Sequence, residues 1–126
     1  MEKAGIIKHN KPIVIGEKNE KIRDLFKIEA DKKSAPIYFS KISQEHKSDL
    51  RGPFVQKNIS LALKALDILK LGIEKKDIEK GILNVKENTK IYGRWDLIRN
   101  KPKIIFDAGH NICLLYTSDA ADDQLG

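Results

Sequence analysis

The strongest constraint on the fold is a strand–helix–strand pattern in the first third of the chain. Pro12–Gly16 is a short apolar run between a proline and a glycine, which is typical of a strand. Glu17–Lys33 carries apolar residues at helical spacing, and Ala35–Phe39 is extended again. This order predicts a βαβ unit, with parallel strands joined by a right-handed crossover. We therefore predict an α/β fold with a mostly parallel sheet and covering helices.

Two further helices are predicted after this unit. The apolar residues between positions 59 and 71 form one broad stripe, and Gly72 suits the position just beyond a helix end. A shorter helix is predicted over residues 73–83. The polar run 86–90 is predicted as a loop.

The stretch Tyr92–Asn111 combines a flexible junction with a polar cluster. Gly93-Arg94 places a cation after the loop, and residues 100–102, Asn-Lys-Pro, are turn chemistry. Lys103–Phe106 is predicted as the strand that opens a parallel sheet and is buried on both faces, because its Ile-Ile-Phe run does not alternate. Open α/β sheets bind ligands at the carboxyl ends of their strands. There the chain carries an acid, an imidazole and an amide: Asp107, His110 and Asn111.

Length and composition are those of one globular domain. The chain has 126 residues, of which 33% are charged and 40% are hydrophobic. No apolar run approaches the roughly 18 residues of a membrane span, and no charged-then-apolar leader suggests export. A single cysteine excludes an internal disulfide. We therefore expect a cytoplasmic protein without a membrane partner.

The formal net charge of +6 raises the alternative of a basic nucleic-acid-binding module. However, 20 of the 24 cationic residues are lysines, scattered as Lys-Lys or Glu-Lys pairs. Arginine is the more usual base reader and phosphate clamp, and no stacking aromatic residues are interleaved with the charge. The pattern favours a solvated lysine-rich face and no nucleic-acid partner.

Three phrases of the sequence carry a family resemblance. They are Glu-Lys-Ala-Gly-Ile-Ile-Lys at residues 2–8, Gly-Pro-Phe-Val-Gln-Lys-Asn at residues 52–58, and Gly93-Arg94 followed by a strand and Asp-x-x-His-Asn at residues 107–111. Together they resemble the folylpolyglutamate synthase/dihydrofolate synthase branch of the Mur ligase family. Two details depart from its pattern: Ala108-Gly109 exchanges the two small residues, and Val55 stands where the family has glutamine.

The resemblance implies a domain organisation. Residues 1–88 would be the C-terminal part of a Mur-ligase-type central ATPase domain, with a mostly parallel sheet and helices. Residues 89–111 would be the hinge and the first strand of a Rossmann-like C-terminal domain. Residues 112–126 do not fit the family, and Ile112–Asp123 back-translates into the transposase end sequence used to prepare sequencing libraries. We interpret this tail as translated adapter, which carries no functional meaning.

The resemblance also implies roles for five residues. Lys3 matches the lysine that this family carbamylates, and the carbamate would help to hold Mg²⁺; Lys3 and Arg94 would be the catalytic pair. Asn58 matches the asparagine that contacts adenine. Arg94 would reach the phosphates of ATP, Asp107 would meet the ribose hydroxyls, and His110 would contact the nucleotide. A side-chain amide suits adenine because it both donates and accepts hydrogen bonds.

Each of these residues also has an ordinary structural interpretation. Lys3 would then be an exposed lysine beside Glu2, and Asn58 a polar residue in the first turn of a helix. Arg94 would face solvent, and Asp107 and His110 would be a polar strand end.

The implied function is that of an ATP-dependent amide ligase, and its cofactors would be ATP and Mg²⁺. It would add glutamate to dihydropteroate or a folyl-glutamate through an acyl phosphate, and the full-length enzyme is expected to be a cytoplasmic monomer. No phosphate-binding loop of the pattern Gly-x-x-x-x-Gly-Lys-Ser/Thr occurs, so we expect it upstream of Met1 and expect the isolated chain to be inactive. Alternatives are a Mur-type ligase acting on a cell-wall peptide precursor, the nucleic-acid-binding module, and a structural fragment without a ligand.

Overall fold

The structure is a computed structural model that describes residues 2–42 and 45–109. It divides into two compact units, each of which is described by itself. The first unit is formed by Met1–Glu45 and Gln56–Gly72, and the second by His46–Val55 and the chain from Ile73 onward. This division differs from the boundary near residue 88 that the sequence suggests, and that boundary stays a prediction.

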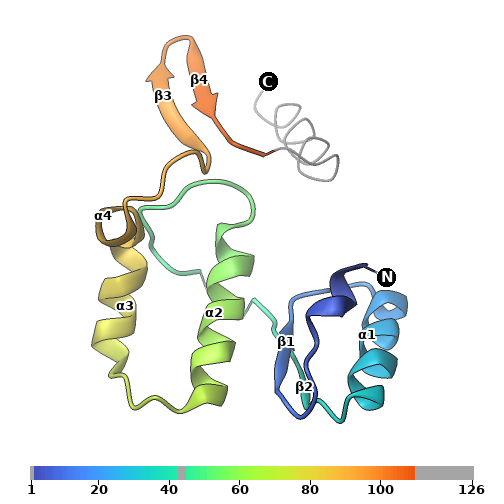
Figure 1. The fold of residues 1–126 in the computed structure, drawn as a ribbon. Coiled ribbons are helices and arrows are strands. Elements are labelled where there is room, and N and C mark those ends of the chain that lie inside the picture. The colour runs from blue at the N-terminus through green and yellow to red at the C-terminus, as the bar shows by residue number, and fades with distance from the viewer. Residues whose placement is uncertain (1, 43–44, 110–126) are drawn as a thin grey trace. The chain divides into compact units, whose positions relative to one another are not determined.

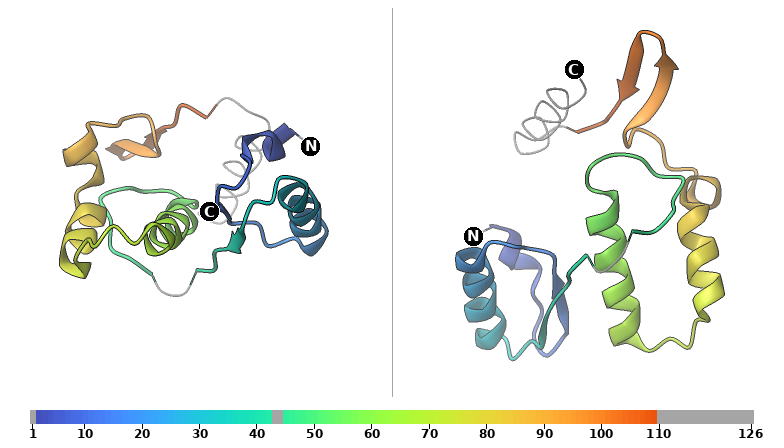
Figure 2. Two further views of the ribbon diagram at one scale, coloured as in Figure 1. Left: turned by 60° about the horizontal axis from the view of Figure 1, so that its bottom comes forward. Right: turned by 180° about the vertical axis from the view of Figure 1, so that it is seen from behind.

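The first unit contains the predicted βαβ arrangement (Figure 1). Strands β1 and β2 pair in parallel, with Ile13 opposite Ile37 and Ile15 opposite Phe39. In Figures 1 and 2 the helix α1 lies on one side of this strand pair and the helix α2 on the other. The elements are the 3₁₀ helix η1 (Glu2–Ile6), β1 (Ile13–Ile15), α1 (Glu20–Lys32), β2 (Ile37–Phe39) and α2 (Val55–Leu69). The prediction of an α/β fold with parallel strands is confirmed.

Local chemistry sets the bounds of the helices in this unit. The side chain of Asn19 caps α1, since its Oδ1 accepts the backbone N–H of Lys21 at 3.0 Å. The helix α2 ends at Leu69, three residues before the predicted glycine. Lys70 takes the left-handed conformation there, with φ of 48°, and its N–H donates to the carbonyl of Leu66.

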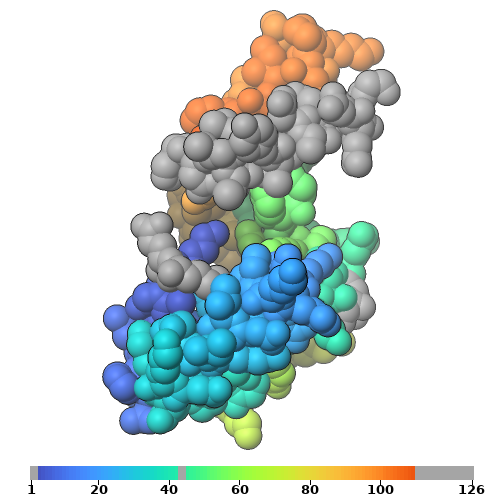
Figure 3. All heavy atoms as spheres, turned by 90° about the vertical axis from the view of Figure 1, so that its right-hand side faces the viewer, coloured from blue at the N-terminus to red at the C-terminus, as the bar shows by residue number. Residues whose placement is uncertain are grey.

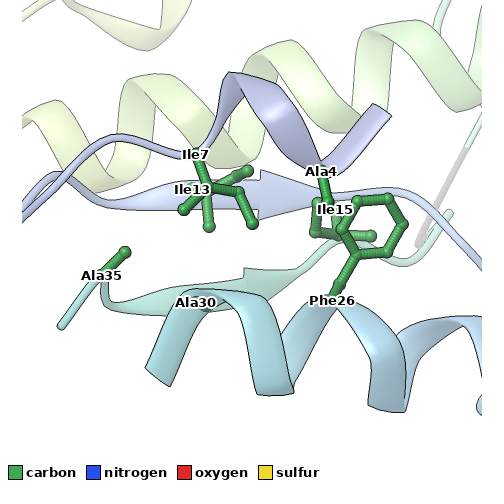
Figure 4. Close-up of a cluster of buried hydrophobic side chains, with 7 residues drawn as sticks. All are labelled: Ala4, Ile7, Ile13, Ile15, Phe26, Ala30 and Ala35. Carbon is green, nitrogen blue, oxygen red and sulfur yellow. The ribbon is translucent and has the colours of Figure 1, made fainter. Parts of the chain in front are cut away.

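The core of the first unit lies between α1 and the segment formed by η1 and β1 (Figure 4). Phe26 points from α1 toward Ile15 and Ala4, and Ile7 is 2% exposed. Full burial of a side chain such as Phe26 contributes about 1.5–3 kcal/mol. The buried cluster consists of Ala4, Ile7, Ile13, Ile15, Phe26, Ala30 and Ala35.

The outward face of α1 is solvated. This surface faces the viewer in the space-filling view of Figure 3. It carries the ion pairs Lys27–Asp24 and Lys32–Glu29, each between residues three positions apart. The charges of Lys27 and Lys32 are thus matched by local carboxylates, as on a solvated face.

The second unit contains two helices and a hairpin: α3 (Lys75–Leu83), α4 (Val85–Thr89), β3 (Asp96–Asn100) and β4 (Lys103–Phe106). Residues 86–89, predicted as loop, belong to α4. Strand β4 forms as predicted, while the parallel sheet that it is expected to open, with neighbours outside this chain, stays a prediction. Among the described residues β4 pairs antiparallel with β3, which was not predicted, and Ile104 and Phe106 are 40% and 52% exposed. The two-residue turn Lys101-Pro102 folds β4 back against β3. A turn this short can join only antiparallel strands.

An aspartate at the start of β3 anchors the segment that precedes it. Asp96 Oδ2 accepts the backbone N–H of Gly93 at 2.6 Å, and Oδ1 accepts from the Lys86 ammonium. Lys86 is itself fixed, because its backbone N–H donates to Asp49 Oδ2 at 2.8 Å. These bonds connect the 46–55 segment, α4 and the hairpin within the second unit.

No helix of the described residues is long and apolar enough to cross a membrane.

We expect the hairpin to be the least stable part of the described chain, because two-stranded hairpins with exposed faces are marginal in water. In amide hydrogen exchange, Ile104–Phe106 should exchange at least about 100-fold faster than Phe26 and Ala30 of α1. A chain that ends at Asn88 should be more soluble and keep the protection of α1. Equal protection of the hairpin and α1 in a monomeric sample would contradict this expectation.

We also expect the second unit to loosen in acid. The hydrogen bond from Lys86, and then that from the Gly93 N–H, lower the pKa of Asp96 below its ordinary value. The resulting stabilisation is present above about pH 4, the unfolded pKa, and is lost as pH falls through the lowered folded pKa. Fluorescence of Trp95, the single tryptophan, should report this acid transition.

The Asp96→Asn variant should lose this acid dependence and be less stable at neutral pH. Asp24→Asn is the matched control, because its carboxylate is 62% exposed in a surface pair. If Asp96→Asn kept the acid transition of the unmodified chain, the assignment to Asp96 would be wrong.

Candidate functional site

A pocket lies at the carboxyl ends of the two parallel strands of the first unit. Its volume is about 300 Å³. Gly16 follows β1 directly and Ser40 follows β2 directly, so both strand ends contribute to its wall. The remaining wall is formed by Glu17-Lys18, Phe39, Lys41-Ile42, Arg23 of α1, and Lys57 and Ser60 of α2. This is the edge at which open α/β sheets bind ligands.

Positive charge dominates this pocket. Four cations, Lys18, Arg23, Lys41 and Lys57, stand against a single carboxylate, that of Glu17. The guanidinium of Arg23 lies over the ring of Phe39, 4.0 Å from its centre, in a cation–π contact. The pocket is therefore suited to an anion with an apolar surface beside it.

The carboxylate of Glu17 is committed to the backbone. Its Oε1 accepts the N–H groups of Lys18 at 2.7 Å and Asn19 at 2.9 Å. The Asn19 hydrogen bond is the largest cause that lowers the pKa of Glu17; burial opposes it, and the Lys18 N–H and the charges of Lys57 and Lys3 add to it. Glu17 thus stays ionised as the anchor of the turn between β1 and α1.

Sequence reasoning missed this pocket. It placed the ligand-binding edge after Lys103–Phe106 and left the ends of β1 and β2 without a role. The available signal was the βαβ pattern itself, because parallel strands end at one edge, where Gly16 and Ser40 must lie together. The contribution of α2 had no signal, since Lys57 is remote in sequence.

Two of the predicted site residues lie in the first unit. Lys3 is in η1, and its side chain is exposed rather than desolvated as carbamylation would favour. Its charge nevertheless acts on Glu17, so Lys3 lies within electrostatic range of the pocket. Asn58 is exposed in the first turn of α2. Their roles with Mg²⁺ and adenine stay predictions.

Two other predicted residues lie in the second unit and are brought together. Asp107 Oδ2 accepts the backbone N–H of Trp95 at 3.0 Å, directly after Arg94, and Oδ1 accepts the N–H of Gly109 at 2.7 Å. The side chains of Arg94 and Asp107 are both exposed. The structure thus places the predicted cation and acid at one end of the hairpin, while His110 lies outside the described residues.

Gly93 sets the path of the backbone into Arg94. It is buried, has φ of 76°, and its carbonyl accepts the N–H of Ala108 at 2.9 Å. A Cβ atom at this position would lie 3.2 Å from both the Ala108 Cβ and the Phe106 ring. The conformation favours glycine, and a side chain here would need Ala108 and Phe106 to shift by a few tenths of an ångström.

The described residues do not by themselves form a metal centre. Within residues 2–42 and 45–109, no three His, Cys, Asp or Glu side chains gather to hold a metal ion. Carbamylated Lys3 would supply oxygen ligands, but Glu17 through its Oε1 and Asp96 through both of its oxygens already accept hydrogen bonds within the chain. We derive no step through Mg²⁺ from these residues.

Comparison with known proteins supports the fold at the level of structure. No protein-family model and no curated protein matches the sequence. The crystal structure of folylpolyglutamate synthase from Thermotoga maritima is similar to this chain, with a TM-score of 0.66 and 26% sequence identity. The similarity covers 92% of this chain and 33% of the synthase chain, so this chain spans about a third of the synthase. The chain has an α/β fold that matches part of the folylpolyglutamate synthase fold.

Proposed function

We propose that this chain is part of an ATP-dependent ligase that adds glutamate to dihydropteroate or a folyl-glutamate. The observation that carries the proposal is the structural similarity to folylpolyglutamate synthase over nearly the whole chain. The three sequence phrases support it independently, because they suggest the same branch without use of the structure. The name of the structural neighbour also favours a folate substrate over a cell-wall peptide precursor.

The proposed reaction proceeds in two steps. The γ-phosphoryl group of ATP is transferred to a substrate carboxylate, which gives an acyl phosphate and ADP. The amine of glutamate then attacks the acyl carbon, and the tetrahedral intermediate expels phosphate to leave the amide. Reactions of this type depend mainly on positioning and on neutralisation of phosphate charge.

Arg94 and Asp107 are suited to hold the nucleotide. Each carboxylate oxygen of Asp107 accepts one backbone N–H, and each retains a lone pair that could accept a ribose hydroxyl. Arg94 is exposed, directly precedes Trp95, whose backbone N–H donates to Asp107, and would neutralise phosphate oxygens. Asn58 and His110 would contact the nucleotide, and Lys3 as a carbamate would contribute to Mg²⁺ binding.

The proposed domain organisation is the one that the family resemblance implies. Residues 1–88 belong to the central ATPase domain, residues 89–111 begin the C-terminal domain, and residues 112–126 are translated adapter. The whole enzyme would act as a cytoplasmic monomer on small-molecule substrates.

We expect Arg94→Gln to reduce kcat/KM for ATP by about 100-fold in the full-length protein that carries this segment, because a phosphate-neutralising cation is removed. Arg99→Gln is the matched control, since Arg99 is an exposed arginine on β3. The assay is ATP-dependent incorporation of glutamate into dihydropteroate. The kcat/KM of the Arg99→Gln control should stay within about twofold of that of the unmodified protein.

The 126-residue chain alone should show no incorporation. Full activity of Arg94→Gln would contradict the role of Arg94. Incorporation into a peptide precursor, but not into a folate substrate, would contradict the proposed substrate class.

A further inference from the structure

The basic pocket of the first unit uses none of the residues that the family resemblance assigns to ATP or Mg²⁺. It is formed where β1 and β2 end, and it gathers Lys18, Arg23, Lys41 and Lys57. Among the described residues, none of these four cations forms an ion pair with a carboxylate. This distinguishes them from Lys27 and Lys32 of α1, which pair with neighbouring acids.

The one carboxylate in the wall offsets only part of their charge. Glu17 is held by two backbone N–H groups of the turn that starts α1. Four positive charges against one negative charge leave an excess of three in a pocket of about 300 Å³. Concentrated charge of one sign in a concave site attracts ligands of the opposite sign.

Arg23 is held in place on an apolar surface. Its guanidinium lies over the Phe39 ring, and its Nε atom is buried without a hydrogen-bond partner in the part of the chain that the structure describes. A buried Nε cannot take part in the side-on, two-bond pairing of arginine with a carboxylate. The terminal nitrogens of Arg23 remain able to donate to an oxyanion, and the three lysine ammoniums are compact point charges of the kind that bind phosphate.

We propose that this pocket binds a phosphoryl group, either as free inorganic phosphate or as part of a small phosphorylated ligand. The lysines and Arg23 would neutralise its oxygens, and the hydroxyl of Ser40 at the end of β2 could donate to one of them. Ser60 forms part of the wall but does not donate to the ligand, because its hydroxyl donates to the Gln56 carbonyl at 2.8 Å. Phe39 and Ile42 provide an apolar wall for the rest of the ligand.

The test is titration of the 126-residue chain by isothermal titration calorimetry at constant ionic strength, with inorganic phosphate, ADP and glutarate as probes. Lys41→Gln is the main variant, because Lys41 is exposed and its loss leaves the core intact. Lys18→Gln is a second exposed variant in the pocket wall. Lys21→Gln is the matched control, an exposed lysine on the first turn of α1 that is not in the wall. Circular dichroism verifies that each variant is folded.

We expect phosphate to bind, and each pocket variant to weaken binding by about tenfold, as for loss of one charge-assisted hydrogen bond. The control should stay within about twofold. Equal weakening of ADP binding would identify a nucleotide as the source of the phosphoryl group, and an effect on phosphate alone would identify the free ion.

Three results would overturn the proposal. They are no phosphate binding by the folded chain at millimolar concentration, glutarate binding as tight as phosphate binding, or pocket variants indistinguishable from Lys21→Gln. None of these results bears on the ligase function, which rests on other residues.

Discussion

The parallel pairing of β1 with β2 is the constraint on which the first unit depends. Parallel strands cannot be joined by a tight turn, so the chain must cross over through α1. That crossover buries Phe26 and Ala30 against Ile13 and Ile15 and forms the core. The same pairing brings both strand ends to one edge, where Gly16 and Ser40 open the basic pocket. Core and pocket are therefore two results of one topology.

The second unit is organised by carboxylates that bind backbone N–H groups rather than by a comparable core. Asp96 binds the N–H of Gly93, and Asp107 binds those of Trp95 and Gly109. Arg94 thus lies between two backbone groups that are each tied to an aspartate. The backbone of Arg94 is therefore fixed, while its long side chain can still move. This arrangement suits the phosphate-binding role proposed for Arg94.

The sequence was a good guide where the pattern was local. Short apolar runs and helical spacing were sufficient for the βαβ unit, because its partners follow each other along the chain. The strand β3 was not predicted, because Asn100 was assigned to a turn and residues 96–99 to no element. The strand β4 was expected to be buried because its apolar run does not alternate. The contribution of α2 to the pocket could not be derived, because Lys57 joins the wall only through the packing of that helix. The roles of Lys3, Asn58, Arg94 and Asp107 stay predictions, since no ligand accompanies them.

The conformation of Gly93 has a consequence for how the segment around Arg94 can vary. Its positive φ and the 3.2 Å approach to Ala108 and Phe106 exclude any side chain without movement of the hairpin end. A saturation library of this segment would therefore tolerate change at Arg94 as regards folding, but a side chain at Gly93 would strain the backbone that carries the arginine. Arg94 thus supplies the cation, and Gly93 sets the backbone direction from which its side chain extends.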